Sequence, residues 1–121
     1  MNAPIASPYL DIPVAPYTFS QQEQEAQQIL ECVGHSFQVG VKEIIGGGRR
    51  PHLARARIVA YWLLRTLTQI TLSDIGRIMQ KDHTSVRAGY RHVIQLRASD
   101  AAFCAFTDQL SAAIVGRLSA Q

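Results

Sequence analysis

Long apolar runs are missing from this sequence of 121 residues. No stretch approaches the ~18 apolar residues that a membrane-spanning helix needs. The first residues contain neither the basic region nor the apolar core of a signal peptide. We therefore expect a cytoplasmic protein. The length suits one domain, and a hydrophobic content of 47% is enough for a modest core.

Cysteine and histidine are scarce and scattered. Cys32 and Cys104 are isolated cysteines that belong to no CxxC pair, so we expect buried thiols rather than a disulfide or a zinc site. The four histidines are scattered along the chain and do not make a metal site. We expect neither a metal nor a cofactor.

Signatures of catalysis are also missing. The run Gly46-Gly47-Gly48 is not followed by the Gly-Lys-Ser/Thr of a nucleotide-binding P-loop. Asp82 and His83 are adjacent, so on a helix they would point in different directions and would not form a dyad. We do not expect an enzyme.

Acidic residues almost disappear between residues 46 and 97. This segment contains ten basic residues and only two acidic ones, Asp74 and Asp82; ten minus two leaves +8, although the whole chain carries only +3. Such segregation favours a polyanionic partner. Nine of the ten basic residues are arginines, which suits bidentate contacts with phosphate or guanine, although a GC-rich coding sequence would produce the same bias.

Proline is concentrated at the start of the chain. Pro4, Pro8, Pro13 and Pro16 exclude a persistent helix or a central strand there. We expect residues 1–19 to form an extended tail that packs on the domain or docks a protein partner, and residues 20–121 to form the folded domain.

Helical periodicity is present instead, and neither strand alternation nor an internal repeat is visible. We predict helices over residues 20–33, 41–45 and 51–67, with the third as the central buried helix. Ser20 and Glu23 would form a capping box for the first helix, and Gly34 would end it. The last helix should begin at residue 99 or 100, and its core-facing residues should be Phe103, Phe106, Leu110, Ile114 and Leu118. The prediction is an all-α bundle of five or six helices.

The segment from residue 71 to residue 97 predicts two helices joined by a tight turn. Thr71 suits the N-cap of the first helix, with Asp74 in its first turn, and the carboxylate of Asp82 could cap the second. Gly76 would let a neighbouring segment approach closely. In the second helix the apolar period is kept by Val86, Tyr90, Val93 and Ile94, while Thr84, Arg87, Arg91 and Gln95 lie on the opposite face.

The beginning of the second helix, Asp82-His83-Thr84-Ser85, is more polar than a cap requires. Short side chains with donors, acceptors and a methyl group are what a recognition helix needs when its N-terminus enters the major groove of DNA. From the residues alone, an ordinary capped surface helix explains this stretch equally well.

Two longer patterns resemble a known family. Asp82-His83-Thr84-Ser85-Val86, preceded by Leu72-Ser73-Asp74-Ile75-Gly76, resembles the C-terminal DNA-binding domain (domain IV) of the bacterial replication initiator DnaA, whose signature ends Asp-His-Thr-Thr-Val. Ala54-Arg55-Ala56-Arg57 lies where that family usually has Ala-Arg-Pro-Arg. The resemblance covers residues 29–118 and implies a Trp-repressor-like helix-turn-helix fold.

The resemblance also implies roles for individual residues. It places Arg49 in the minor groove with Arg50 assisting, Arg57 on phosphate or base, and Arg65 on the DNA backbone. Leu72 and Ser73 would hold a phosphate through backbone amides and a hydroxyl. The residues that would read bases are Asp82, His83, Thr84 and Ser85. Lys81, Arg87 and Arg91 would be phosphate clamps or simply solubilising charges.

The implied function is that of a stand-alone, sequence-specific binder of double-stranded DNA. It would occupy initiator boxes as a monomer and regulate transcription or replication initiation. The alternative is an interaction adaptor, or a non-specific nucleic-acid binder, that uses the same basic face. Three departures bear on this: Ser85 replaces a threonine, the loop before the central helix is rich in glycine, and the inter-helix turn is one residue shorter than usual. We also expect no ATP-driven origin melting, because the ATPase module of the initiator is not part of this sequence.

Overall fold

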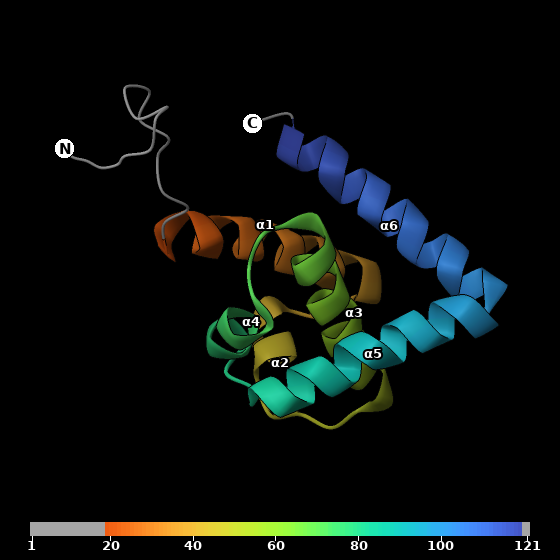
Figure 1. The fold of residues 1–121 in the computed structure, drawn as a ribbon, viewed down its shortest axis with the longest axis horizontal. Helices are drawn as coiled ribbons and strands as arrows, with labels where there is room; N and C mark the ends of the chain where they lie inside the picture. The colour runs from red at the N-terminus through yellow and green to blue at the C-terminus, as the bar shows by residue number, and fades with distance from the viewer. Residues whose placement is uncertain (1–18, 120–121) are drawn as a thin grey trace, which may run out of the picture.

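The computed structural model describes residues 19–119, which fold into α-helices joined by short turns and loops (Figure 1). The helices are α1 (Phe19–Phe37), α2 (Val41–Ile45), α3 (Pro51–Leu67), α4 (Leu72–Met79), α5 (His83–Ser99) and α6 (Ala101–Ser119). The predicted all-α class is confirmed. Among these residues, no helix combines the length and apolarity required to cross a lipid bilayer. The N-terminal tail was predicted over residues 1–19, but Phe19 belongs to α1. The rest of the predicted tail, and the protein partner predicted for it, lie outside the described part of the chain.

Helix α3 is the centre of the bundle, as predicted. It contacts α1, α2, α4, α5 and α6, and Pro51 occupies its first turn. Its buried side chains lie on nearly all sides of the helix: Leu53, Ala56, Val59, Ala60, Tyr61, Trp62, Leu63 and Leu64. Burying one such large apolar side chain contributes about 1.5–3 kcal/mol, so this helix supplies a large share of the stability.

Helix α1 differs from the prediction at both ends. It begins at Phe19, so Ser20 lies inside the helix and the predicted capping box is wrong. It also continues past Gly34 and ends before Gln38, whose φ of 58° is left-handed. Gly34 is needed for a different reason: a Cβ there would lie 2.6 Å from the carbonyl oxygen of Val39, where the chain turns back.

Helix α6 begins at Ala101, one residue after the predicted start, and buries the predicted stripe with one exception. The Oδ1 atom of Asp100 accepts a hydrogen bond from the amide of Phe103 at 3.0 Å and caps the helix. Phe106, predicted to face the core, is 37% exposed and meets Phe37 edge-on. Its place in the buried stripe is taken by Thr107, whose hydroxyl accepts a hydrogen bond from Arg97 at 2.5 Å.

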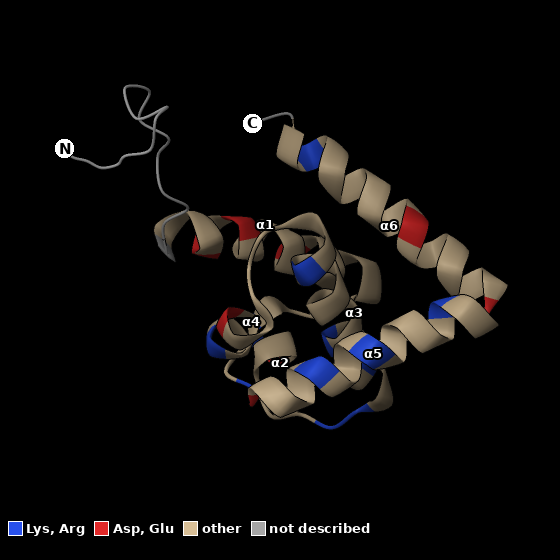
Figure 2. Ribbon diagram, in the orientation of Figure 1, with Lys and Arg blue, Asp and Glu red and all other residues tan. Residues whose placement is uncertain are grey.

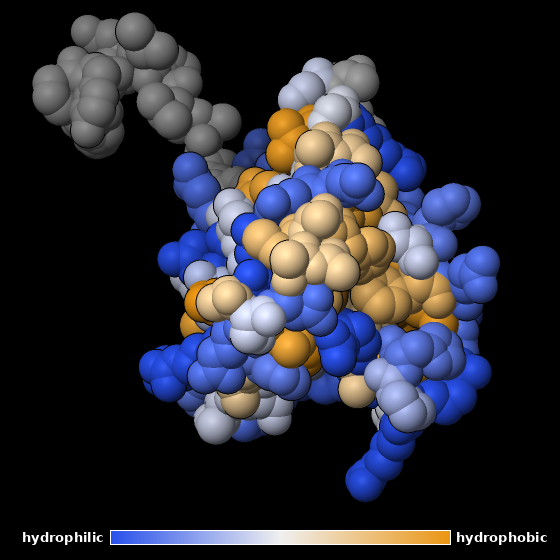
Figure 3. Space-filling view, turned by 90° about the vertical axis from the view of Figure 1, so that its right-hand side faces the viewer, coloured by the Kyte–Doolittle hydropathy of each residue, from blue (hydrophilic) through white to orange (hydrophobic). Residues whose placement is uncertain are grey.

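The α5–α6 end of the molecule carries apolar surface among hydrophilic side chains (Figure 3). Ile94 of α5, predicted to face inward, is 46% exposed, because the core stripe of α5 consists of Val86, Gly89 and Val93. The two cysteines are free thiols, and each is only partly buried rather than fully buried as expected.

Candidate nucleic-acid interface

Helices α4 and α5 form the predicted helix-turn-helix. The hydroxyl of Thr71 accepts a hydrogen bond from the Asp74 amide at 3.1 Å, as expected for its N-cap role. Helix α4 ends at Met79, and the next residue, Gln80, is left-handed with a φ of 57°. The Lys81 amide donates to the carbonyl of Gly76 at 2.8 Å. A Cβ on Gly76 would lie 2.7 Å from the carbonyl oxygen of Lys81, so the turn closes tightly only because this position has no side chain.

The N-terminus of α5 differs from the prediction in one respect. Asp82 is the N-cap residue, and its carbonyl accepts the Val86 amide at 3.1 Å, but its carboxylate makes no cap hydrogen bond. Instead, Oδ1 of Asp82 lies 3.9 Å from Nδ1 of His83, and both side chains are more than 60% exposed. The first turn of α5 therefore presents its amides without a side-chain cap, together with exposed Thr84 and Ser85.

The outer face of α5 is polar and cationic, as predicted. Arg87 and Arg91 are exposed and have no ion-pair partner among the described residues. The inner face packs closely on α3, because a Cβ on Gly89 would lie 2.7 Å from Cδ2 of Tyr61. The close contact fixes the position of α5 relative to α3.

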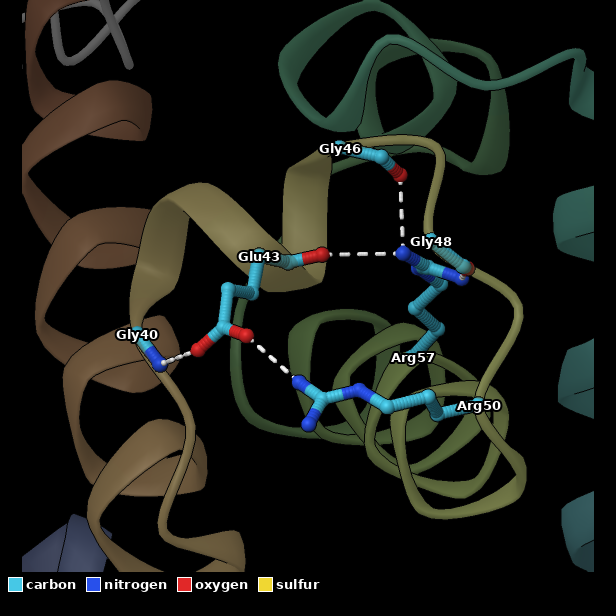
Figure 4. Close-up of polar contacts among 6 residues, drawn as sticks. All are labelled: Gly40, Glu43, Gly46, Gly48, Arg50 and Arg57. Carbon is cyan, nitrogen blue, oxygen red and sulfur yellow. Dashed lines mark hydrogen bonds and ion pairs between the residues drawn. The ribbon is translucent and has the colours of Figure 1, made fainter.

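The glycine-rich loop between α2 and α3 presents two arginines in different ways. Arg49 is exposed and has no hydrogen-bond or ion-pair partner among the described residues. Arg50 donates to the carboxylate of Glu43 at 2.5 Å (Figure 4). A hydrogen bond from the Gly40 amide has the largest effect on Glu43 and lowers the pKa of its carboxyl below the ordinary value. Burial opposes this effect, and the positive charge of Arg50 again lowers the pKa.

Arg57 points into the protein loop rather than out to solvent. Its Nε donates to the carbonyl of Ile44 at 2.7 Å. Its Nη2 donates to the carbonyls of Glu43 and Gly46, both at 2.8 Å (Figure 4). Its Nη1 also donates to the carbonyl of Gly48. The resemblance placed Arg57 on DNA; that role remains a prediction, and the structure shows a guanidinium already occupied by four backbone acceptors.

Lys81 has similar surroundings. Its ammonium donates to the carbonyls of Ile45, Gly46 and Met79, the last two at 3.2 and 3.3 Å. Burial, followed by the positive charge of Arg57, lowers the pKa of Lys81. Lys81 thus joins the turn of the helix-turn-helix to the start of the glycine-rich loop.

The remaining predicted contact residues lie at helix ends. Arg65 is exposed in the last turn of α3, and the first turn of α4 contains exposed Ser73 and partly buried Leu72. Arg97 serves the fold: it stacks over Trp62 at 4.5 Å and pairs with Asp108 of α6 at 2.9 Å. Some of the basic residues seen in the sequence are therefore exposed on the surface, and others stabilise the fold.

Sequence reasoning missed the cluster of carbonyls around Arg57 and Lys81. The available signal was the length of α2, since a helix of five residues cannot satisfy its own terminal carbonyls. Two cations at a helix C-terminus also complement its dipole.

Basic and acidic residues are concentrated on different elements of the described chain. Figure 2 shows basic positions on α5 and on the α2–α3 loop, and acidic positions on α1. In the part of the chain that the structure describes, no group of His, Cys, Asp and Glu side chains could hold a metal ion. The exposed cations suit the phosphates of a nucleic acid, and the polar side chains at the start of α5 suit hydrogen bonds to base edges.

Comparisons with known proteins agree with this geometry. The sequence profile described as bacterial DnaA protein helix-turn-helix matches residues 26–93. The chromosomal replication initiator DnaA of Gloeothece citriformis is 30% identical over 106 residues, which is 87% of this chain and 22% of that protein. DnaA of Nitrosospira multiformis is 36% identical over 77 residues, 63% of this chain and 16% of that protein.

The third relative, DnaA of Nitrosomonas eutropha, is 35% identical over 75 residues, or 61% of this chain. The chain spans about a fifth of the length of these initiators at most. The predicted family is confirmed over more than half of the chain. The matched region is a DNA-binding domain rather than a catalytic one, which supports the expectation that the chain is not an enzyme. This chain belongs to the bacterial DnaA helix-turn-helix family, a family of DNA-binding domains.

Proposed function

We propose that this protein recognises a specific sequence in double-stranded DNA, with α5 in the major groove and the α2–α3 loop at the minor groove. The observation that carries the proposal is the start of α5. Its uncapped first turn exposes Thr84 and Ser85, and Arg87 follows on the same helix without an ion-pair partner among the described residues. A plain surface helix needs none of these features together.

The first turn of α5 supplies the groups for reading bases. The carboxylate of Asp82 suits the amino group of cytosine, and the imidazole of His83 can donate to guanine or to phosphate. The hydroxyls of Thr84 and Ser85 suit thymine or adenine, and the Thr84 methyl can meet a thymine methyl. All four side chains are exposed, so no rearrangement of the core is needed.

The surrounding groups would hold the DNA backbone and the minor groove. Arg65, Arg87 and Arg91, together with the amides and hydroxyl at Leu72 and Ser73, are suited to phosphates. Arg49 is suited to a narrow, A·T-rich minor groove, whose enhanced negative potential attracts guanidinium groups. Arg50 can join it by leaving Glu43, because exposed ion pairs contribute little to stability.

Biologically, such a protein would occupy initiator boxes and compete with a full-length initiator, or regulate transcription from nearby promoters. The relatives that support this are named replication initiators, and this chain corresponds to about a fifth of them. The proposed role is therefore limited to occupying DNA sites.

Competition for a labelled duplex tests the proposal. A duplex carrying an initiator box should keep the protein bound in the presence of a large excess of shuffled duplex at fixed salt. Specific recognition typically exceeds non-specific binding by about 10³-fold or more. If shuffled DNA of equal length displaces the box as efficiently as unlabelled box does, the protein is a non-specific nucleic-acid binder.

A further inference from the structure

Five backbone carbonyls at the end of α2 and in the following loop converge on two cations. Those of residues 43, 44, 46 and 48 accept from Arg57, and those of residues 45 and 46 accept from Lys81. Arg57 belongs to α3, whereas Lys81 belongs to the turn immediately before the recognition helix. The loop that carries Arg49 is therefore bonded both to the central helix and to the helix-turn-helix.

We propose that Arg57 and Lys81 are positioning residues that hold Arg49 at a fixed distance from α5, so that minor and major groove are read by one rigid unit. This inference rests on the proposed function of Arg49 and α5. It reassigns Arg57 and Lys81, which resemblance and charge place among the DNA contacts, to a role inside the protein.

The alternative, a direct DNA contact by Arg57, has a structural cost. The guanidinium would have to leave four carbonyls, and the partly buried carbonyls of Ile44 and Gly46 would lose a charged donor. Arg49, Arg87 and Arg91 have no such bonds to break among the described residues. A guanidinium is also suited to this cluster, since its planar donors reach several acceptors that a single ammonium cannot.

The glycines of the loop show how closely the chain is wrapped around Arg57. A Cβ on Gly46 would lie 2.9 Å from the carbonyl oxygen of Lys42, and one on Gly48 would lie 3.0 Å from Cδ1 of Leu53. A Cβ on Gly47 would meet nothing within 4 Å. Gly46→Ala should therefore disturb the loop, and Gly47→Ala is its matched control.

The first test needs no DNA. In Arg57→Ala, amide hydrogen exchange where α2 meets the loop should accelerate by on the order of tenfold, chiefly at Gly46, whose N–H donates to the carbonyl of Lys42 at 2.8 Å. The amides of α5 beyond its first turn should keep their protection. Arg87→Ala, which removes an exposed arginine, should change neither set. Loop exchange equal to that of the unmodified protein would overturn the proposal.

A second pair of variants guards against general loss of folding. Arg57→Lys keeps the charge but loses the planar donors, and Lys81→Met removes the other cation while keeping an unbranched stem. Both should also accelerate loop exchange while the thermal unfolding transition remains cooperative. If all three variants lose protection uniformly along the chain, Arg57 and Lys81 are merely structural, and the positioning role is wrong.

The second test separates positioning from contact through a double-mutant cycle on an initiator-box duplex. Arg57→Ala alone should weaken binding by on the order of tenfold, yet by less than about twofold when Arg49 is already alanine. In that Arg49→Ala background, the slope of log K against log salt should not change on adding Arg57→Ala. A further tenfold loss with a slope flattened by about one unit would mean that Arg57 contacts phosphate directly.

The outcomes also distinguish this inference from the proposed function. If the unmodified protein shows no preference for the box, the proposed function fails and the positioning role fails with it. If the box is preferred and Arg49→Ala weakens it, but Arg57→Ala acts equally in both backgrounds, only the positioning role fails.

Discussion

Thr84 and Arg87 lie one turn apart on α5, are both exposed, and are expected to do different work. Thr84→Ala removes the hydroxyl and the methyl group that we propose contact a base edge. We expect it to reduce discrimination between the preferred site and single-base variants by roughly 1–3 kcal/mol, measured as a ratio of Kd values. Unchanged ratios with uniformly weaker binding would show that Thr84 does not read a base.

Arg87→Ala removes a positive charge that we expect to contact phosphate, and not a side chain that contacts a base. It should weaken binding to preferred and shuffled duplexes by similar factors and flatten the dependence of log K on log salt by about one unit. Titrations at several salt concentrations measure both effects. A loss confined to the preferred site would place Arg87 on a base and not on a phosphate.

At this scale the sequence predicted which residue types would gather but not what each would bond. Arg49 and Arg57 have the same side chain within nine positions, yet one is exposed and the other donates to four carbonyls. The difference depends on the path of the loop around α3, which no local pattern encodes. The carboxylate of Asp82 likewise lies beside His83 instead of capping α5.

Two glycines in long helices should respond oppositely to the same change. Gly89→Ala would place a Cβ 2.7–2.9 Å from atoms of Tyr61 and Ile58, and such overpacking typically costs 1–3 kcal/mol, more than the helix propensity gained. Gly116→Ala meets nothing within 4 Å and should stabilise the protein by up to about 1 kcal/mol. The change in the free energy of unfolding in denaturant measures both.

The result that would contradict this packing is equal stabilisation by the two substitutions. It would mean that α5 can move away from α3 at no cost, and therefore that the position of the recognition helix is not fixed by this contact. Ala88, exposed beside Gly89 on α5, offers a control position for substitutions that do not touch α3.

Helix α2 should weaken in acid because of Glu43. The Gly40 amide, followed by Arg50, lowers the pKa of this carboxyl below its ordinary value of 4.5. A lowered pKa in the folded state means that the contribution is fully present above the unfolded value and is lost as pH falls through the folded one. An NMR titration should find the Glu43 carboxyl below 4.5, and Glu43→Gln should abolish the associated change at the Gly40 amide.

A Glu43 pKa at or above 4.5 would show that these hydrogen bonds do not form in solution. The loop would then lose one of its anchors, and Arg50 would be free for DNA from the start.

The sequence predicted which helices form better than where each helix ends and which face it buries. Periodicity and turn chemistry predicted α2 and α3 with their observed bounds, and Thr71 and Asp100 cap the helices that follow them. The failures are positions where tertiary contacts override local preference. Gly34 serves the close return of the chain at Val39, and Thr107 displaces Phe106 from the core because its hydroxyl meets Arg97.

For the whole molecule, the decisive property is the separation of charge and its combination with a polar recognition turn. Exposed arginines alone would bind any nucleic acid, with affinity that falls steeply as salt increases. What distinguishes a specific binder is the set of short side chains at the start of α5, held on a scaffold where α3 buries most of its surface. The central claim is therefore about discrimination and not about affinity.

Enrichment of bound molecules from a pool of random duplexes at physiological salt measures that discrimination directly. The unmodified protein should enrich a single asymmetric motif. Thr84→Ala should weaken the base preference at the positions read by α5, while the preference for A·T pairs at the proposed Arg49 site stays unchanged. Recovery of a pool without any motif, bound only in proportion to length and charge, would contradict sequence-specific recognition by α5.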